Sequence, residues 1–149
     1  MTSTIYKNKS TNWTTSDIPD FEGKTVFITG ANSGLGFYSA KALAEKNAHV
    51  VLACRTLKKA NSAIDKLKLL NPKGKFSPLE LDLSDLNNVS EIGSKFSNEF
   101  ENLDLLINNA GIMHPPKTLS VQGFEIQFAV NHLAPVSYTH LTLPTIYSV

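Results

Sequence analysis

Hydrophobic residues in this chain alternate between short continuous runs and stripes of helical spacing, starting near Lys24. The runs are rich in β-branched and other apolar residues and predict four strands, at 25–29, 49–53, 75–81 and 103–107. The stripes repeat every three or four positions and predict helices over about 34–47, 60–70, 86–100 and from Val121 onward. Strands that alternate with helices of this length predict an α/β fold with a parallel sheet covered on both faces.

Two details of the pattern add expectations about single elements. Pro78 lies within the third run, and because proline cannot donate to a sheet ladder, this strand is expected at a sheet edge. The first helix is expected to turn one apolar face to the core, formed by Leu35, Tyr38, Ala42 and Leu43.

A glycine-rich segment, Thr29-Gly-Ala-Asn-Ser-Gly-Leu-Gly36, joins the first predicted strand to the first predicted helix. Glycines let such a turn bend tightly and approach a pyrophosphate, and the helix N-terminus offers N–H groups to the phosphates. An ordinary glycine turn is the alternative, but the strand–turn–helix context favours phosphate binding. The predicted binding residues are Gly30, Asn32, Ser33, Gly34, Leu35 and Gly36.

The end of the second predicted strand favours NADP over NAD as the dinucleotide. NAD sites commonly carry Asp or Glu about 20 residues after the glycines, where it accepts from the ribose 2′-OH. Segment 50–56 contains no acid, and Arg55 stands close to that position. A guanidinium pairs well with a 2′-phosphate. The alternative role for Arg55 is a solvated charge at the start of the next loop.

Two further polar segments follow predicted strands. Asp82-Leu83 comes after the third, where a carboxylate can accept from an adenine amino group. Helix capping is the alternative for Asp82, and Ser84 or Asp85 could cap the helix instead. Asn108–Gly111 ends the fourth strand, at the edge where open α/β sheets bind ligands. Its two amides can tie down neighbouring backbone, and its two small residues let a cofactor ring approach.

Together with Asn131-His132-Leu133, these motifs resemble the short-chain dehydrogenase/reductase family. The stretches GKTVFITGANSGLG and LDLLINNAGIM are similar to those of its retinol-dehydrogenase-like and protochlorophyllide-reductase-like members. The resemblance covers about Phe21–Leu133. It implies a Rossmann-type doubly wound parallel sheet and NAD(P)-dependent hydride transfer between an alcohol and a carbonyl.

The resemblance also implies roles for single residues. Three glycines would line the pyrophosphate, namely Gly30, Gly34 and Gly36. Arg55 would meet the adenosine ribose or its phosphate, and Asp82 the adenine. Three residues would flank the nicotinamide ribose, namely Asn109, Ala110 and Gly111. Asn131 matches the family's catalytic asparagine, which holds a proton-relay water, although a helix kink or a buried amide bond would also explain an asparagine there.

The family's chemistry also needs a serine and a Tyr-x-x-x-Lys motif, and neither can be identified. Tyr138 is followed four residues later by Thr142, Tyr147 lies two residues from the end, and no lysine occurs after Lys117. Ser137 and Tyr138 are therefore not expected to be catalytic. We expect the sheet to be truncated after about four strands and the chain to be inactive as an alcohol dehydrogenase.

The residues from about Pro135 onward differ from the rest of the chain. All 27 formal charges lie at or before Glu125, and the last 24 residues carry none. Pro135 is expected to break the helix that starts before it, and the β-branched residues beyond are expected to be extended. Val136–Thr145 resembles a translated transposase-end sequencing adapter, which leads to the hypothesis that 135–149 is a non-native tail.

The composition of the 149 residues fits one domain and excludes several function classes. A net charge of +1 gives no electrostatic footprint for nucleic acid or an anionic membrane. No apolar run approaches the ~18 residues needed to span a bilayer. With Cys54 as the single cysteine and four histidines without ligand spacing, no disulfide and no metal site are expected. The N-terminus lacks a signal-like apolar stretch, so a cytoplasmic location is expected.

The sequence thus predicts three parts: a flexible arm (1–20) that docks weakly, a partial NAD(P)-binding Rossmann domain (21–134) and a non-native tail (135–149). The predicted function is an oxidoreductase of which only the cofactor-binding half is present, with NADP favoured as cofactor. Its parent would act on a small alcohol or carbonyl and, as in other family members, could form a homo-oligomer. The alternatives are a non-catalytic NADP(H)-binding protein and an inactive gene fragment.

Overall fold

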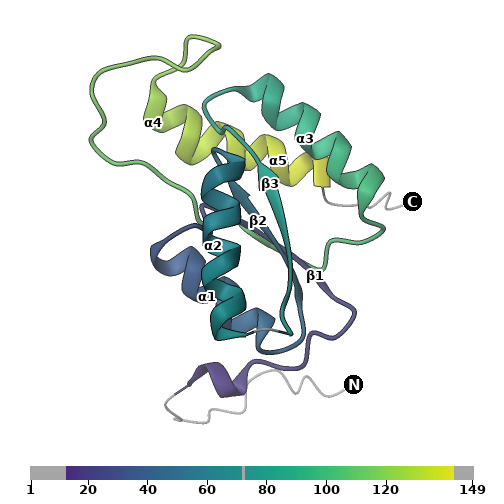
Figure 1. The fold of residues 1–149 in the computed structure, drawn as a ribbon. Coiled ribbons are helices and arrows are strands. Elements are labelled where there is room, and N and C mark those ends of the chain that lie inside the picture. The colour runs from purple at the N-terminus through teal and green to yellow at the C-terminus, as the bar shows by residue number, and fades with distance from the viewer. Residues whose placement is uncertain (1–12, 72, 143–149) are drawn as a thin grey trace, which may run out of the picture.

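The structure, a computed structural model, describes residues 13–71 and 73–142, of which 140–142 as backbone. A parallel sheet with the strand order β3-β2-β1-β4 runs through its centre (Figure 1). The strands are β1 (Thr25–Thr29), β2 (His49–Cys54), β3 (Lys75–Glu80) and β4 (Leu105–Ile107). Within the described sheet β3 and β4 are the edge strands, so the edge position predicted from Pro78 is confirmed.

Helices follow the strands in the order that the sequence pattern predicts. The helices after the first three strands are α1 (Gly34–Ala44), α2 (Leu57–Leu70) and α3 (Leu86–Glu99). After β4, a loop leads to one helical segment composed of α4 (Ile126–Phe128), the π-helical turn η2 (Ala129–Leu133) and α5 (Ala134–Thr142). A 3₁₀ turn, η1 (Thr15–Asp17), precedes β1.

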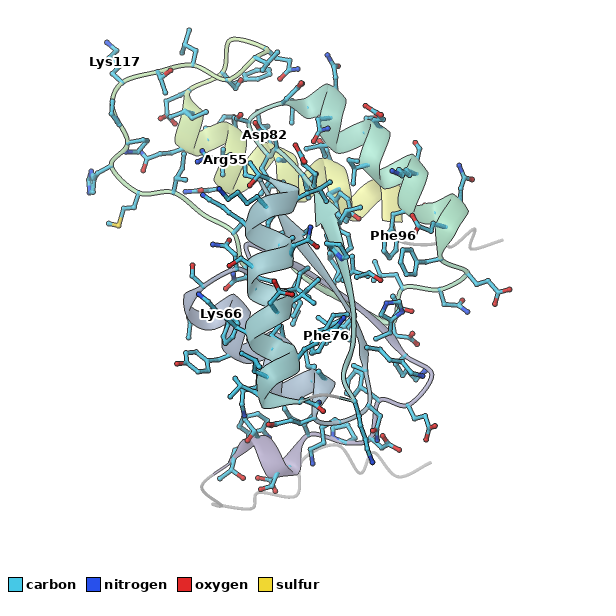
Figure 2. All side chains as sticks on the ribbon, viewed as in Figure 1. Arg55, Lys66, Phe76, Asp82, Phe96 and Lys117 are labelled. Carbon is cyan, nitrogen blue, oxygen red and sulfur yellow. The ribbon has the colours of Figure 1, made fainter. Side chains whose placement is uncertain are left out.

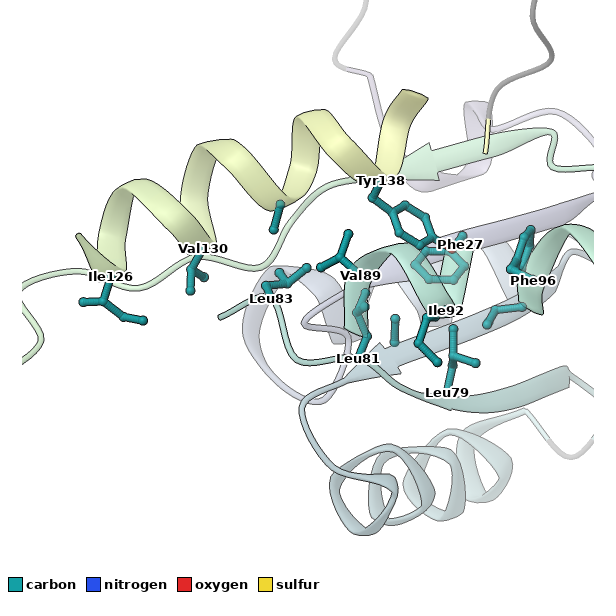
Figure 3. Packing of buried hydrophobic residues seen from close by; sticks show 13 residues of the cluster. Phe27, Leu79, Leu81, Leu83, Val89, Ile92, Phe96, Ile126, Val130 and Tyr138 are labelled. Carbon is teal, nitrogen blue, oxygen red and sulfur yellow. The ribbon is translucent and has the colours of Figure 1, made fainter. Parts of the chain in front are cut away.

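Each face of the sheet carries its own hydrophobic core, because successive residues of a strand point to opposite faces. On one face, Val26 and Ile28 of β1 pack with buried residues of α1 and α2. On the other face, Phe27 packs with α3 and α5, with its ring stacked on Tyr138 at 4.7 Å and edge-on to Phe96 at 5.1 Å (Figure 3). The predicted Rossmann-type α/β fold is confirmed, with a layer of helices on each side of a parallel sheet.

The face of α1 that meets the sheet differs from the predicted one. Leu35 and Tyr38 are 81% and 67% exposed, whereas Leu43 is buried as expected. The buried residues of α1 are Gly36, Ala40, Leu43 and Ala44. Small side chains let the helix approach the sheet closely, and the glycine turn before the helix sets which side faces inward. The prediction of a core face through Leu35 and Tyr38 was therefore wrong.

The helical segment continues through Pro135, against the prediction of a break and an extended tail. Pro135 is the second residue of α5, directly after the π-turn. In this turn Ala134 N–H bonds back five residues to Ala129 O, so the ladder widens just where the proline ring would otherwise crowd the preceding turn. Thr139 Oγ1 donates to Pro135 O at 2.7 Å, which accommodates a β-branched residue in the helix. The predicted tail beyond residue 142 lies outside the described residues.

Regular structure also begins earlier than Lys24, where the sequence pattern placed its start. Residues 13–20 contain η1 and contact the turn between α1 and β2. Lys46 Nζ donates to Ser16 O at 2.9 Å, and Asn47 Nδ2 donates to Asp20 Oδ1 at 2.9 Å. The first twelve residues of the predicted arm lie outside the described part of the chain.

Candidate nucleotide-binding site

The turn between β1 and α1 has the backbone that the glycine pattern predicts. Gly30 and Gly34 have φ angles of +66° and +56°, which glycine adopts without strain. A Cβ on Gly36 would lie 2.5 Å from Asn109 Nδ2 and 2.7 Å from Gly30 O, so this position requires glycine. Ser33 is the N-cap of α1, and within the described residues its side chain makes no capping hydrogen bond. The first N–H groups of α1 are thus left for another acceptor.

Asn109 and Thr29 lock the ends of β4 and β1 together beneath this turn. Asn109 Nδ2 donates to Thr29 O at 3.0 Å, and Thr29 Oγ1 accepts from the backbone N–H groups of Asn109 and Ala110, both at 3.0 Å. The predicted use of an amide to tie down neighbouring backbone is therefore what Asn109 does. Asn108 turns elsewhere and donates from Nδ2 to Thr139 Oγ1 at 3.2 Å.

A cavity of about 580 Å³ opens at the carboxyl ends of the strands. Its volume is in the range of small-molecule and cofactor sites. The predicted site residues that line it are Gly30, Asn32, Arg55, Asp82, Leu83, Ala110 and Gly111. The predicted residues outside this lining are Ser33, Gly34, Leu35, Gly36, Asn109 and Asn131. Of these, Gly36 and Asn109 support the turn from below, and Leu35 is exposed.

Two cations border the cavity where β2 ends and α2 begins. Arg55 directly follows β2, and Lys59 lies one helical turn later in α2; both are exposed and both line the cavity. Figure 2 shows Arg55 and Asp82 at the same end of the sheet. Lys59 was missed from the sequence, because Arg55 precedes α2 and no helical spacing connects the two residues.

Asp82 borders the cavity and does not cap the next helix. Its Oδ1 accepts from Ser84 N at 2.9 Å and from Ser84 Oγ at 2.6 Å. Asp85 is the N-cap of α3, where its Oδ1 accepts from Asn87 N at 3.0 Å. The capping alternative is thus filled by Asp85, and Asp82 borders the cavity with a side chain held by Ser84.

Asn131 lies in the π-turn, and its side chain is bound to backbone. Its Oδ1 accepts from Ile112 N at 2.9 Å, and its Nδ2 donates to Ile112 O at 2.8 Å. This pair fixes the chain just after the Asn109–Gly111 segment against the helix. Pro135, four residues on, has no N–H, so the Asn131 carbonyl lacks its α-helical donor. The sequence offered a helix kink or a buried amide bond as structural explanations; the structure shows a π-turn at this position and an amide bonded to backbone at an exposed side chain.

Comparison with known proteins shows the family of this chain. A family model described as short chain dehydrogenase matches residues 24–148. The chain belongs to the short-chain dehydrogenase family. The match runs past Leu133, where the resemblance noted in the sequence ended.

Relatives of this short-chain dehydrogenase chain are longer than the chain itself. An oxidoreductase of Schizosaccharomyces pombe is 39% identical over 134 residues, which cover 90% of this chain and 40% of the relative. Retinol dehydrogenase 13 of Homo sapiens is 40% identical over 121 residues, or 81% of this chain and 37% of the relative. The chain thus spans about 40% of the length of the curated relatives it matches.

A solved structure shows the same fold. A protein from Mycobacterium paratuberculosis superimposes with a TM-score of 0.79 and 42% identity, covering 90% of this chain and 47% of that one. A metagenomic short-chain oxidoreductase crystallised with NADP has a TM-score of 0.70 and 24% identity, which shows a shared fold.

Tyr138 of this short-chain dehydrogenase chain lies in the core, away from the cavity lining. Its side chain is fully buried and stacks on Phe27. Burial raises the pKa of the Tyr138 phenol above its usual range, opposite to what a proton-exchanging tyrosine needs.

Cys54 is the next residue with reactive chemistry, and it lies in the core. Cys54 is buried at the end of β2, and burial raises the pKa of its thiol to about 11, which keeps it protonated and unreactive. Among the described residues, no group of three or more His, Cys, Asp or Glu side chains is placed to hold a metal ion. None of the described helices is long and apolar enough to cross a membrane.

Proposed function

We propose that this domain binds NADP(H) in the cavity at the carboxyl ends of its strands, as the cofactor-binding part of an alcohol/carbonyl oxidoreductase. The observation that carries the proposal is the convergence of a phosphate-binding turn, two cations and one carboxylate on one cavity. The glycine turn and the α1 N-terminus would hold the pyrophosphate, and Asp82 would accept from the adenine amino group. When bound, the nicotinamide ring would supply or accept hydride.

The choice of NADP over NAD rests on the charges beside the adenosine end. Arg55 and Lys59 line the cavity at the end of β2, where a ribose 2′-phosphate would lie. Glu80, which pairs in register with Cys54, accepts from Leu57 N at 3.2 Å and so serves the start of α2. Glu80 lies outside the cavity lining, so both charged side chains that line it at the end of β2 are cations, which would favour a phosphate over a hydroxyl.

Fluorescence titration with NADPH and NADH tests this proposal. Arg55→Ala should weaken NADPH binding by about 10- to 100-fold, the size expected for charge-assisted hydrogen bonds to a phosphate, and leave NADH binding nearly unchanged. Lys58→Ala is the matched control, because Lys58 is an exposed neighbouring cation outside the cavity lining. Absence of saturable NADPH binding to the unmodified chain would contradict the proposal.

A second candidate function is NADP(H) binding without turnover. It is favoured by the core position of Tyr138, which keeps this tyrosine away from the cavity lining. The chain would then bind NADPH but form none from NADP and a panel of primary and secondary alcohols. Measurable alcohol-dependent absorbance at the wavelength of NADPH would favour the enzyme instead.

A further inference from the structure

The loop between β4 and α4 ends in a compact hairpin, Leu119–Glu125, which we call the strap. Leu119 and Glu125 form an antiparallel bridge, and Ser120 N donates to Phe124 O at 2.8 Å. Ser120 is buried, and its Oγ accepts from Phe124 N at 3.1 Å. Gly123 has a φ of +82°, which allows the tight reversal. These bonds give the strap a defined shape of its own.

The strap is bonded to the loop between β3 and α3, which lies more than thirty residues earlier in the sequence. Val121 N donates to Ser84 O at 3.1 Å. Gln122 makes two bonds: its Oε1 accepts from Leu86 N at 3.1 Å, and its Nε2 donates to Asp85 Oδ1 at 2.7 Å. Leu86 N is a first-turn donor of α3 with no partner inside the helix, so Gln122 supplies a tertiary cap.

The same loop carries the acid of the cavity. Ser84, whose carbonyl oxygen is held by the strap, binds Asp82 Oδ1 with both its N–H and its hydroxyl. Asp82, Leu83 and Ser84 all line the cavity, as does Leu119 at the start of the strap. Gln122 thus holds residues 85 and 86 of the segment whose neighbour Ser84, itself bonded by Val121 N, binds the Asp82 carboxylate.

We propose that Gln122 is a positioning residue for recognition of the nucleotide base: it holds the β3–α3 loop so that Asp82 faces the adenine amino group. This inference rests on the proposed NADP(H) function and goes beyond it, because Gln122 lies outside the cavity lining. The hydrogen bond from Gln122 also lowers the pKa of the Asp85 carboxyl, which keeps the cap of α3 ionised and able to accept both its bonds.

The test compares NADPH with its deamino analogue, in which the 6-amino group of the adenine is replaced by a carbonyl oxygen. Asp82 can accept from the amino group but faces an acceptor in the analogue, so the unmodified chain should prefer NADPH by about tenfold. Gln122→Met keeps the side-chain volume and removes both hydrogen bonds. The preference should fall to about twofold or less in this variant.

The matched control is Gln127→Met. Gln127 Oε1 accepts from His114 N at 3.1 Å, so this change removes a glutamine hydrogen bond to the same long loop without touching residues 82–86. The control should keep the tenfold preference. An unchanged preference in Gln122→Met would overturn the inference, as would loss of folding in Gln122→Met with a folded control, since Gln122 would then serve stability alone. Failure of the unmodified chain to bind NADPH would instead overturn the proposed function.

Discussion

Thr29 shows how one hydroxyl joins two strand ends at the candidate site. Its Oγ1 accepts from the N–H groups of Asn109 and Ala110, both at 3.0 Å, and the residue is 2% exposed. A buried backbone N–H group without an acceptor lowers the stability of the folded state, so the Thr29 side chain contributes more through its oxygen than through its volume.

Replacing Thr29 with valine should therefore destabilise the domain by about 2 kcal/mol, because two part-buried N–H groups lose their acceptor while the shape is kept. Thr29→Ser retains the oxygen and should recover most of the loss. Urea denaturation followed by circular dichroism measures both free energies of unfolding. Equal stability of the valine and serine variants would show that the hydroxyl is not the stabilising group.

At the scale of secondary-structure elements, the sequence predicted what depends on local pattern. Continuous apolar runs predicted the four strands, and Pro78 predicted the edge position of β3. Apolar residues at helical spacing predicted α3 and its buried face. The sequence did not predict which face of α1 is buried, because the helix carries apolar residues on several sides. The glycine turn before it packs against Asn109 and sets its orientation. The helical segment continues through Pro135 because a π-turn precedes the proline, and residue preferences do not predict such a turn.

The candidate site was predicted to a similar extent. Residues at the ends of strands were found, because parallel strands bring their carboxyl ends to one edge. Lys59 and Gln122 were not found, since each lies on a neighbouring element and only the tertiary structure brings it to the cavity or to the loop beside it. For Asn131, the sequence suggested a water-holding amide, and the structure bonds that amide to Ile112.

The packing of α5 gives a prediction at this scale. Tyr138 is fully buried against Phe27, whereas Val136 on the same helix is 43% exposed. Tyr138→Ala should lower the free energy of unfolding by about 3–5 kcal/mol, as for other buried aromatic residues. Val136→Ala should change it by about 0.5 kcal/mol or less. Thermal and urea melts of both variants measure the difference, and two equally mild effects would mean that α5 does not pack on the sheet.

A surface ion pair joins the chain segments that lead into β1 and β4. Asp104 Oδ1 lies 2.8 Å from Lys24 Nζ, and its Oδ2 accepts from Thr25 N at 2.9 Å. These two hydrogen bonds, that from Lys24 first, hold the pKa of the Asp104 carboxyl below its ordinary value of 3.8. A lowered pKa in the folded state adds stability above the unfolded pKa, and this stability is lost as the pH falls through the folded pKa.

The melting temperature should therefore fall as the pH drops from about 5 toward 2, in part through Asp104. In Asp104→Asn this fall in melting temperature at low pH should be smaller, because the variant lacks the carboxylate whose protonation destabilises the fold. Glu101→Gln, a change at an exposed neighbouring acid, is the control and should retain the full slope. A slope that is the same in Asp104→Asn as in the unmodified chain would exclude this carboxyl as a source of acid sensitivity.

The origin of the residues from Pro135 onward stays a prediction at the scale of the whole chain. Their resemblance to a translated adapter starts at Val136, whereas Ala134 and Tyr138 of α5 are buried in the core that the sheet shares with α3. Long genomic reads across codons 134–149 decide the matter, because the same open frame in uninterrupted genomic DNA would contradict an adapter origin.

The strand order has a consequence for the path of folding. β1 lies between β2 and β4, and the bonds from Thr29 to Asn109 and Ala110 join residues 80 and 81 positions apart in the sequence. Closing so long a loop is slow compared with pairing β1 to β2. A chain leaving the ribosome can therefore form β1, β2 and β3 with their helices while β4 is still being made. The cavity is lined by Ala110 and Gly111 and cannot form before they are made, so under the proposed function a cofactor would stabilise the finished domain and give no help to its early folding.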